Sequence, residues 1–121
     1  MNVLIVDDSA AMRKILRRVL GQAEAPVSQA FEATDGVEAL EVLKTQNIGL
    51  ILSDINMPNM DGLELLSRVR AEEEWRDVPF VMITTEGSDR KVVEAMQLGA
   101  SAYVRKPFTP CQIREKLAGL M

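Results

Sequence analysis

The sequence predicts an α/β fold in which helices cover both faces of a parallel five-stranded sheet. Five short apolar runs alternate with five segments whose apolar residues recur at helical spacing. The runs are nearly continuous in Val, Ile and Leu, which is typical of parallel strands buried on both faces. Strict β-α alternation implies right-handed crossovers and therefore a doubly wound (βα)5 three-layer sandwich. The 121 residues match the length of one domain, which we expect to span residues 1–121.

The first predicted strand is residues 2–6, and an amphipathic helix follows it. Asp8 or Ser9 can cap the start of this helix, and Gly21 lies where the helix would end. The apolar residues of the helix follow the i, i+3, i+4 spacing and are Met12, Ile15, Leu16, Val19 and Leu20.

The other four strand–helix units repeat this arrangement. Their strands are predicted at residues 27–33, 49–53, 79–83 and 100–104. The second helix follows a Thr34-Asp35-Gly36 turn. The fourth starts near Ser88 or Asp89 and ends at Gly99, and the fifth opens with Thr109 as cap and Pro110 at its first position. The helix residues expected to face the core are Val37, Leu40, Leu43, Leu63, Leu66, Val69, Val92, Val93, Met96, Ile113, Leu117 and Leu120.

The composition excludes several kinds of chemistry. The chain has no histidine, so it can form neither a Ser-His-Asp or Cys-His catalyst nor a histidine zinc site. Its single cysteine, Cys111, cannot form an internal disulfide, which suits a reducing cytoplasm. The net charge of −4 disfavours nucleic acid and anionic membranes as partners. The apolar runs are too short to span a membrane, and the first residues lack the basic region of a signal peptide.

Polar residues follow four of the predicted strands at the end where open α/β sheets bind ligands. Asp7 and Asp8 follow the first strand, Asp54 the third, Thr84 the fourth and Lys106 the fifth. If the first and third strands are neighbours, three carboxylates converge. Each like-charge pair at about 4 Å costs about 4 kcal/mol at an effective dielectric near 20. The cluster therefore indicates a compensating cation, and an oxygen-only ligand set suits Mg²⁺ or Mn²⁺.

A carboxylate beside a hard cation, a hydroxyl and an ammonium is also what phosphoryl transfer requires. The carboxylate can act as nucleophile and form an aspartyl phosphate, whose oxygens the cation, lysine and threonine can stabilise. Taken singly, these residues have structural interpretations as a helix cap, a turn residue, a surface lysine and a strand-end hydroxyl. Their joint placement at one sheet edge favours phosphoryl transfer.

These residues and their flanking motifs resemble a bacterial response-regulator receiver domain over essentially the whole chain. The motifs are the Asp7-Asp8 pair, Asp54 in Ser-Asp-Ile-Asn-Met-Pro-Asn-Met-Asp-Gly, Thr84, and Lys106 in Arg-Lys-Pro-Phe. Within the family, the segment Asn-Met-Pro-Asn-Met-Asp-Gly-Leu-Glu-Leu is most similar to the single-domain chemotaxis regulators. The resemblance, rather than the periodicity, implies the flavodoxin-like strand order 2-1-3-4-5.

The resemblance implies that Asp54 is the phosphoacceptor and that a histidine kinase is the phosphodonor. Asp8 and Asp54 would bind Mg²⁺, or Mn²⁺, directly, together with the backbone carbonyl of Asn56, and Asp7 would act through a coordinated water. Lys106 would bridge to Asp54 or to the phosphate, and in the family the Lys-Pro bond after it is typically cis. Thr84 would move toward the phosphoryl group after transfer.

Three further roles come from the resemblance. Asn56 and Glu86 would tune self-dephosphorylation and give a short-lived phosphoryl state, although both can also be plain loop residues. Tyr103 would be the switch aromatic that follows Thr84 inward. This would reshape the face made by the fourth helix, fifth strand and fifth helix, where a downstream protein would dock. We expect self-directed phosphoryl chemistry only, a monomer before phosphorylation, and a dimer, if one forms, after it.

Several other interpretations stay open. The chain can be a receiver cut from a larger response regulator or hybrid kinase, although its end after the fifth helix favours motility control. A phosphorylation-independent scaffold is disfavoured by the intact acidic trio, Thr84 and Lys106. A Mg²⁺-dependent phosphatase with an aspartyl nucleophile would need a second acid or base and a substrate cap. Flavin binding is disfavoured because no Ser/Thr/Gly-rich loop follows the first strand.

Overall fold

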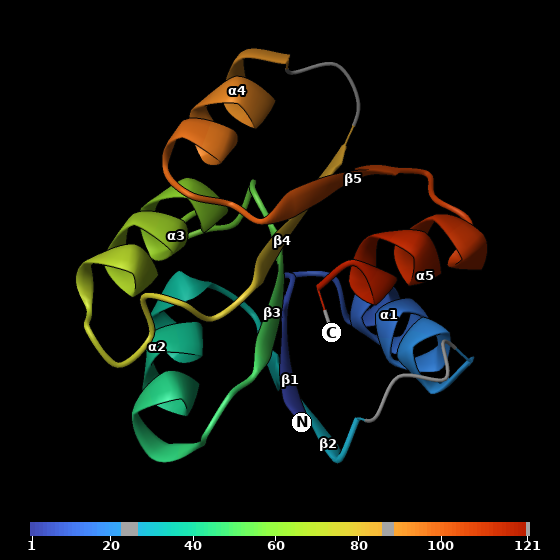
Figure 1. Cartoon of the computed structure of the whole chain (residues 1–121), viewed down its shortest axis with the longest axis horizontal. Coiled ribbons are helices and arrows are strands. Elements are labelled where there is room, and N and C mark those ends of the chain that lie inside the picture. Colours follow the sequence, from blue (N-terminus) through green and yellow to red (C-terminus); the bar gives the residue numbers. More distant parts are fainter. Residues whose placement is uncertain (23–26, 86–88, 121) are drawn as a thin grey trace.

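The computed structural model describes residues 1–22, 27–85 and 89–120. Within these residues five strands alternate with five helices, as the sequence predicts (Figure 1). In chain order the elements are β1 (Asn2–Val6), α1 (Ala10–Gln22), β2 (Gln29–Ala33), α2 (Gly36–Thr45), β3 (Leu50–Asp54), α3 (Gly62–Ala71), β4 (Phe80–Thr85), α4 (Asp89–Gln97), β5 (Ala102–Lys106) and α5 (Pro110–Ala118). None of these helices is long and apolar enough to cross a membrane.

The strands form one parallel sheet in the order β2-β1-β3-β4-β5, which confirms the expected topology. The register aligns the carboxyl ends of the central strands. Val6 lies opposite Ser53, and Asp54 lies opposite Ile83. The residues that follow β1 and end β3 therefore meet at the same edge of the sheet.

Two apolar layers hold the helices to the sheet. Alternate residues of β1 point to opposite faces, so Leu4 packs in one layer and Ile5 in the other. Helices α2, α3 and α4 cover the first layer, and α1 and α5 cover the second (Figure 1). This is the doubly wound three-layer sandwich that the alternation predicts.

The starts of α1 and α5 follow the predicted capping chemistry, whereas Ser88, one candidate for the start of α4, lies outside the described residues. Of the two candidates before α1, Ser9 is the cap, because its hydroxyl accepts from the Met12 N–H at 3.2 Å. Asp35 caps α2 by accepting from the Glu38 N–H. Thr109 caps α5 in a reciprocal capping box with Gln112, and Pro110 is the first helical residue.

The strand boundaries shift toward the functional edge of the sheet. β4 begins at Phe80 because Pro79 has no N–H to donate, although its carbonyl accepts from the Ile51 N–H at 2.9 Å. At the other ends, Asp54 is the last residue of β3 and Lys106 the last of β5. These polar residues belong to the strands themselves, so the sheet ladder fixes the positions of their backbone.

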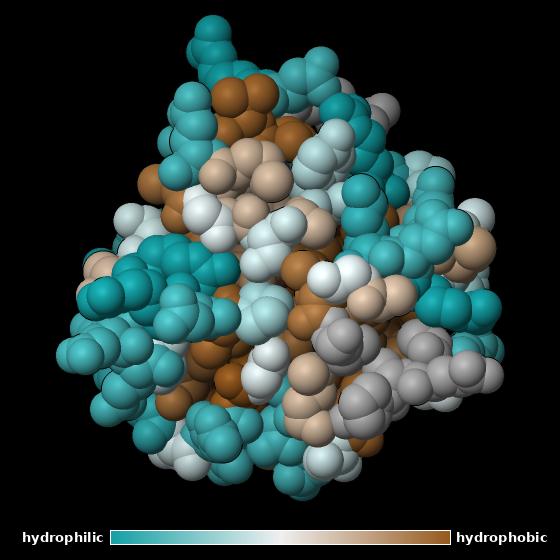
Figure 2. All heavy atoms as spheres, viewed as in Figure 1, coloured by the Kyte–Doolittle hydropathy of each residue, from teal (hydrophilic) through white to brown (hydrophobic). Residues whose placement is uncertain are grey.

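The predicted burial of α4 is wrong in part. Val92 is buried as expected, but Val93 is 54% and Met96 43% exposed, and Ala95 is buried instead. Helix α4 is short and presents only the stripe of Val92 and Ala95 to the sheet, and Val93 lies about 100° further round the helix. Figure 2 shows the resulting apolar atoms on the surface over α4. Ile15 and Val37 are similarly exposed on their helices.

Candidate phosphoacceptor and metal site

Three aspartates gather at the carboxyl edge of the sheet. Asp7 follows β1, Asp8 begins the connection to α1, and Asp54 ends β3. One carboxylate oxygen from each lies within 4.8 Å of the others. Asp7 is 1% and Asp54 6% exposed, whereas Asp8 is exposed. The predicted convergence of the three residues is therefore present.

Asp7 is held at every polar group. Its N–H donates to the Ala33 carbonyl at 3.0 Å. Its Oδ1 accepts from the Ser9 N–H at 2.9 Å, and its Oδ2 accepts from Lys106 Nζ at 3.0 Å. These hydrogen bonds hold the Asp7 carboxylate in one position.

Asp54 is buried at the end of β3 and lies beside Lys106. Its Oδ1 accepts from the Ile55 N–H at 2.8 Å, and its Oδ2 lies 3.5 Å from Lys106 Nζ. Burial raises the pKa of the Asp54 carboxyl above its ordinary value, and although the Lys106 ammonium opposes the shift, Asp7 adds to it. A bound cation, or a covalent bond that removes the negative charge, would offset the free-energy cost of burying this anion.

Lys106 stands between the two buried acids and is closer to Asp7 than to Asp54. The Lys106–Pro107 peptide bond is cis, as it typically is in the receiver family. Thr84 is 3% exposed, and its hydroxyl donates to the Thr85 carbonyl at 2.9 Å. The Thr84 donor is thus engaged with backbone and not with a carboxylate.

The remaining predicted residues lie around this centre. Asn56 follows β3 by two residues, and its side-chain oxygen accepts from Lys91 Nζ of α4 at 2.8 Å. Tyr103 is half-buried on β5, with the Arg105 guanidinium 5.9 Å and the Lys116 ammonium 5.7 Å from its ring centre. Glu86 lies outside the described residues.

Two site neighbours have no signal in the sequence pattern. Lys91 reaches Asn56 across 35 residues, and Arg13 of α1 donates to the Asp7 carbonyl at 2.7 Å. Both look like ordinary helix-surface cations along the chain. Only the three-dimensional arrangement brings them to the edge of the site.

The donor set fits a hard divalent cation. Asp7, Asp8 and Asp54 offer carboxylate oxygens only, and Lys106 is the ammonium that lies against two of them. Oxygen ligands with one exposed member leave access for water, which Mg²⁺ retains when it binds proteins. The residues therefore fit Mg²⁺ better than zinc, which prefers nitrogen and sulfur ligands.

A doubly wound sheet with an acidic trio, a threonine and a lysine at its carboxyl edge defines a receiver-type signalling domain. The chain belongs to the response-regulator receiver family, because the model of the response regulator receiver domain matches residues 3–118. It is 41% identical over its whole length to a chemotaxis protein CheY homolog of Campylobacter jejuni, of which it covers 92%. It is 40% identical over 97% of its length to chemotaxis protein CheY-3 of Vibrio cholerae, of which it covers 88%.

Solved structures agree with this assignment. The fold superposes on chemotaxis response regulator CheY4 of Vibrio cholerae with a TM-score of 0.88 at 34% identity, covering 99% of this chain and 98% of that one. A putative response regulator from Chloroflexus aurantiacus gives a TM-score of 0.90 at 28% identity, with coverage of 98% and 95%. The protein is thus a receiver of two-component signalling with CheY-type chemotaxis homologues.

Proposed function

We propose that this receiver accepts a phosphoryl group on Asp54 from a histidine kinase and returns it to water after a short signalling period. The observation that carries the proposal is the buried Asp54 carboxylate, 3.5 Å from Lys106 and grouped with Asp7 and Asp8. An Asp54 oxygen attacks phosphorus and the P–N bond of the donor breaks. The electron pair of that bond stays with the imidazole nitrogen.

Several residues around Asp54 stabilise the phosphoryl group during this step. Asp8, Asp54 and the Asn56 carbonyl would hold Mg²⁺, or Mn²⁺, and Asp7 would act through a coordinated water. The cation would supply positive charge to the phosphoryl oxygens. Lys106 already lies beside Asp54 and provides a second positive charge. Thr84 gives up its bond to the Thr85 carbonyl and donates to a phosphoryl oxygen instead.

Signal output follows from the movement of Thr84. As its hydroxyl turns toward the phosphoryl group, the Tyr103 ring moves into the space behind it. Beside that ring lies a hollow of about 250 Å³ lined by Tyr103, Val104, Arg105, Pro107, Gln112 and Lys116. A downstream protein docks on this α4–β5–α5 face and responds to the position of the ring.

The lifetime and setting of the signal complete the proposal. Asn56 and Glu86 tune self-dephosphorylation, as the family resemblance implies, and the phosphoryl chemistry of the chain is directed only at itself. The protein is cytoplasmic, does not bind nucleic acid, and is a monomer until it is phosphorylated. Chemotaxis is the favoured pathway because the similar proteins from Campylobacter and Vibrio are chemotaxis proteins.

Intact-mass spectrometry after incubation with acetyl phosphate tests the acceptor. We expect one phosphoryl adduct that requires Mg²⁺ and is absent from Asp54→Asn. The matched control is Asp61→Asn, at the exposed cap of α3, where asparagine also caps well and the adduct should persist. No adduct in the wild type, together with no binding of beryllofluoride, would refute the proposal and favour a phosphorylation-independent scaffold.

A further inference from the structure

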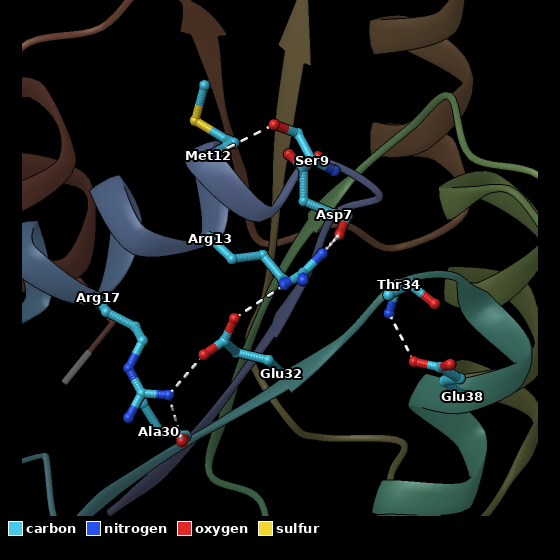
Figure 3. Close-up of polar contacts among 9 residues, drawn as sticks. All are labelled: Asp7, Ser9, Met12, Arg13, Arg17, Ala30, Glu32, Thr34 and Glu38. Atoms are coloured by element: carbon cyan, nitrogen blue, oxygen red, sulfur yellow. Dashed lines mark hydrogen bonds and ion pairs between the residues drawn. The ribbon is translucent and has the colours of Figure 1, made fainter.

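Arg13 connects the acidic turn to the edge of the sheet. It lies in the first turns of α1 and its side chain is only 15% exposed. Its Nε donates to Glu32 Oε1 at 2.8 Å, and its Nη1 donates to the Asp7 carbonyl at 2.7 Å (Figure 3). One planar guanidinium therefore joins α1, β2 and the residue that follows β1.

Glu32 is itself held in place from a second side. Arg17, one turn further along α1, donates to Glu32 Oε2 at 2.7 Å and to the Ala30 carbonyl at 3.3 Å (Figure 3). Burial acts to raise the pKa of Glu32, but the hydrogen bonds from Arg13 and Arg17 outweigh it and lower that pKa. The carboxylate is thus an ionised anchor that fixes the direction in which Arg13 points.

The Asp7 carbonyl belongs to the peptide that leads into Asp8, so its direction sets the orientation of Asp8. The Asp7 side chain has its own anchors in Ser9 and Lys106. Asp8 has none of this kind: among the described residues, no hydrogen bond to its carboxylate is formed. The backbone therefore sets where the exposed Asp8 side chain starts, and Arg13 holds that backbone together with the bond from the Asp7 N–H to the Ala33 carbonyl.

We propose that Arg13, oriented by Glu32 and Arg17, is a positioning residue that presets the Asp7–Asp8 turn for binding of a divalent cation. The proposal rests on the proposed function of this site as a magnesium site. It predicts a change in Mg²⁺ affinity that is opposite to the change expected from charge alone. Removing a positive charge near a cation site would by itself strengthen cation binding, whereas losing the anchor of the turn weakens it.

The test is a Mg²⁺ titration of the unphosphorylated protein, followed by NMR through the backbone amides of Asp8 and Ile55. We expect Arg13→Met, which keeps the apolar stem, to weaken Mg²⁺ binding about tenfold, the lower end of the effect of losing a residue that orients a metal ligand. Without Mg²⁺, the Asp8 amide should shift and the Ile55 amide should stay in place. The matched control is Arg68→Met, which loses only an exposed ion pair with Glu64 on α3 and should bind Mg²⁺ like the wild type.

Arg13→Lys keeps the test decisive if Arg13→Met does not fold. Lysine preserves the charge, but one ammonium on a flexible stem does not reproduce the two-pronged contact with Glu32 and the Asp7 carbonyl. We expect it to weaken Mg²⁺ binding by at least about threefold, which is less than the roughly tenfold loss for removing an orienting residue because the charge and part of the contact remain. Mg²⁺ affinity equal to or above that of the wild type in either variant overturns the proposal. A wild type that binds no Mg²⁺ instead counts against the proposed function itself.

Discussion

Gly62, the first residue of α3, packs directly against the backbone of the phosphoacceptor. Its N–H donates to the Ile55 carbonyl at 2.8 Å. A Cβ at this position would lie 2.1 Å from the Asp54 carbonyl oxygen and 3.0 Å from the Asp54 carbonyl carbon. Replacing Gly62 with alanine therefore forces α3 and the end of β3 apart.

The structure sets the size of the effect. Ordinary contact begins at about 3.4 Å, so the Cβ falls more than 1 Å short of it, against backbone atoms that cannot rotate away. Overpacking a rigid site costs about 1–3 kcal/mol or more, and loss of the bond to Ile55 adds about 1 kcal/mol. The better helix propensity of alanine, worth up to about 1 kcal/mol inside a helix, returns only a small part of this at the first helical position. We expect Gly62→Ala to lower the free energy of unfolding by about 3 kcal/mol.

Two other glycines provide graded controls for urea denaturation. A Cβ on Gly21 in α1 meets nothing within 4 Å, so Gly21→Ala should stabilise by about 0.5–1 kcal/mol. A Cβ on Gly36 meets the flexible Met60 side chain at 2.6 Å, and Gly36→Ala should cost about 1–2 kcal/mol. A Gly62→Ala variant no less stable than Gly36→Ala would refute the reasoning, because it would mean that the β3–α3 junction moves freely.

Three further predictions concern charge and capping. Without Mg²⁺, Asp54→Asn should raise the free energy of unfolding in urea by about 0.5–2 kcal/mol, because it removes a buried charge kept for function; an unchanged or lower value would contradict this. The Glu38 N–H and Asn59 lower the pKa of Asp35, so its ionised form stabilises the fold at any pH above the ordinary pKa of an aspartate. That contribution should fade as the pH falls through the lowered pKa, and Asp35→Ala should flatten the acid limb of a pH-dependent thermal melt. In urea denaturation, Thr109→Ala should lower the free energy of unfolding by about 1 kcal/mol, because the α5 cap is lost. Thr109→Ser keeps a capping hydroxyl and should retain most of the stability of the wild type.

The sequence pattern predicted the elements well because each carried a local signal. The apolar runs marked the strands, and the Thr109-Pro110 pair marked the start of α5. Asp7 and Asp54 could be brought together from the sequence because parallel strands place their carboxyl ends at one edge, although the order of those strands came from family resemblance.

Features that depend on distant parts of the chain could not be predicted in this way. The exposure of Met96 depends on how little of α4 the sheet covers, which periodicity does not record. The contacts of Arg13 with Glu32 and of Lys91 with Asn56 join different elements through long, adaptable side chains. The roles of Thr84 and Tyr103 remain predictions, because they describe a change of state.

The bond from Arg17 to the Ala30 carbonyl also affects the exposed edge of the sheet. β2 is an edge strand of the sheet (Figure 1). Ala33 directs its carbonyl to Asp7 beside β1, and alternation along the strand turns the Ala30 carbonyl outward. The guanidinium of Arg17 occupies this outward acceptor, and the charged Glu32 lies next to it. An approaching strand from a second molecule would have to displace the ion pair before it could extend the sheet, which protects this edge from edge-to-edge aggregation.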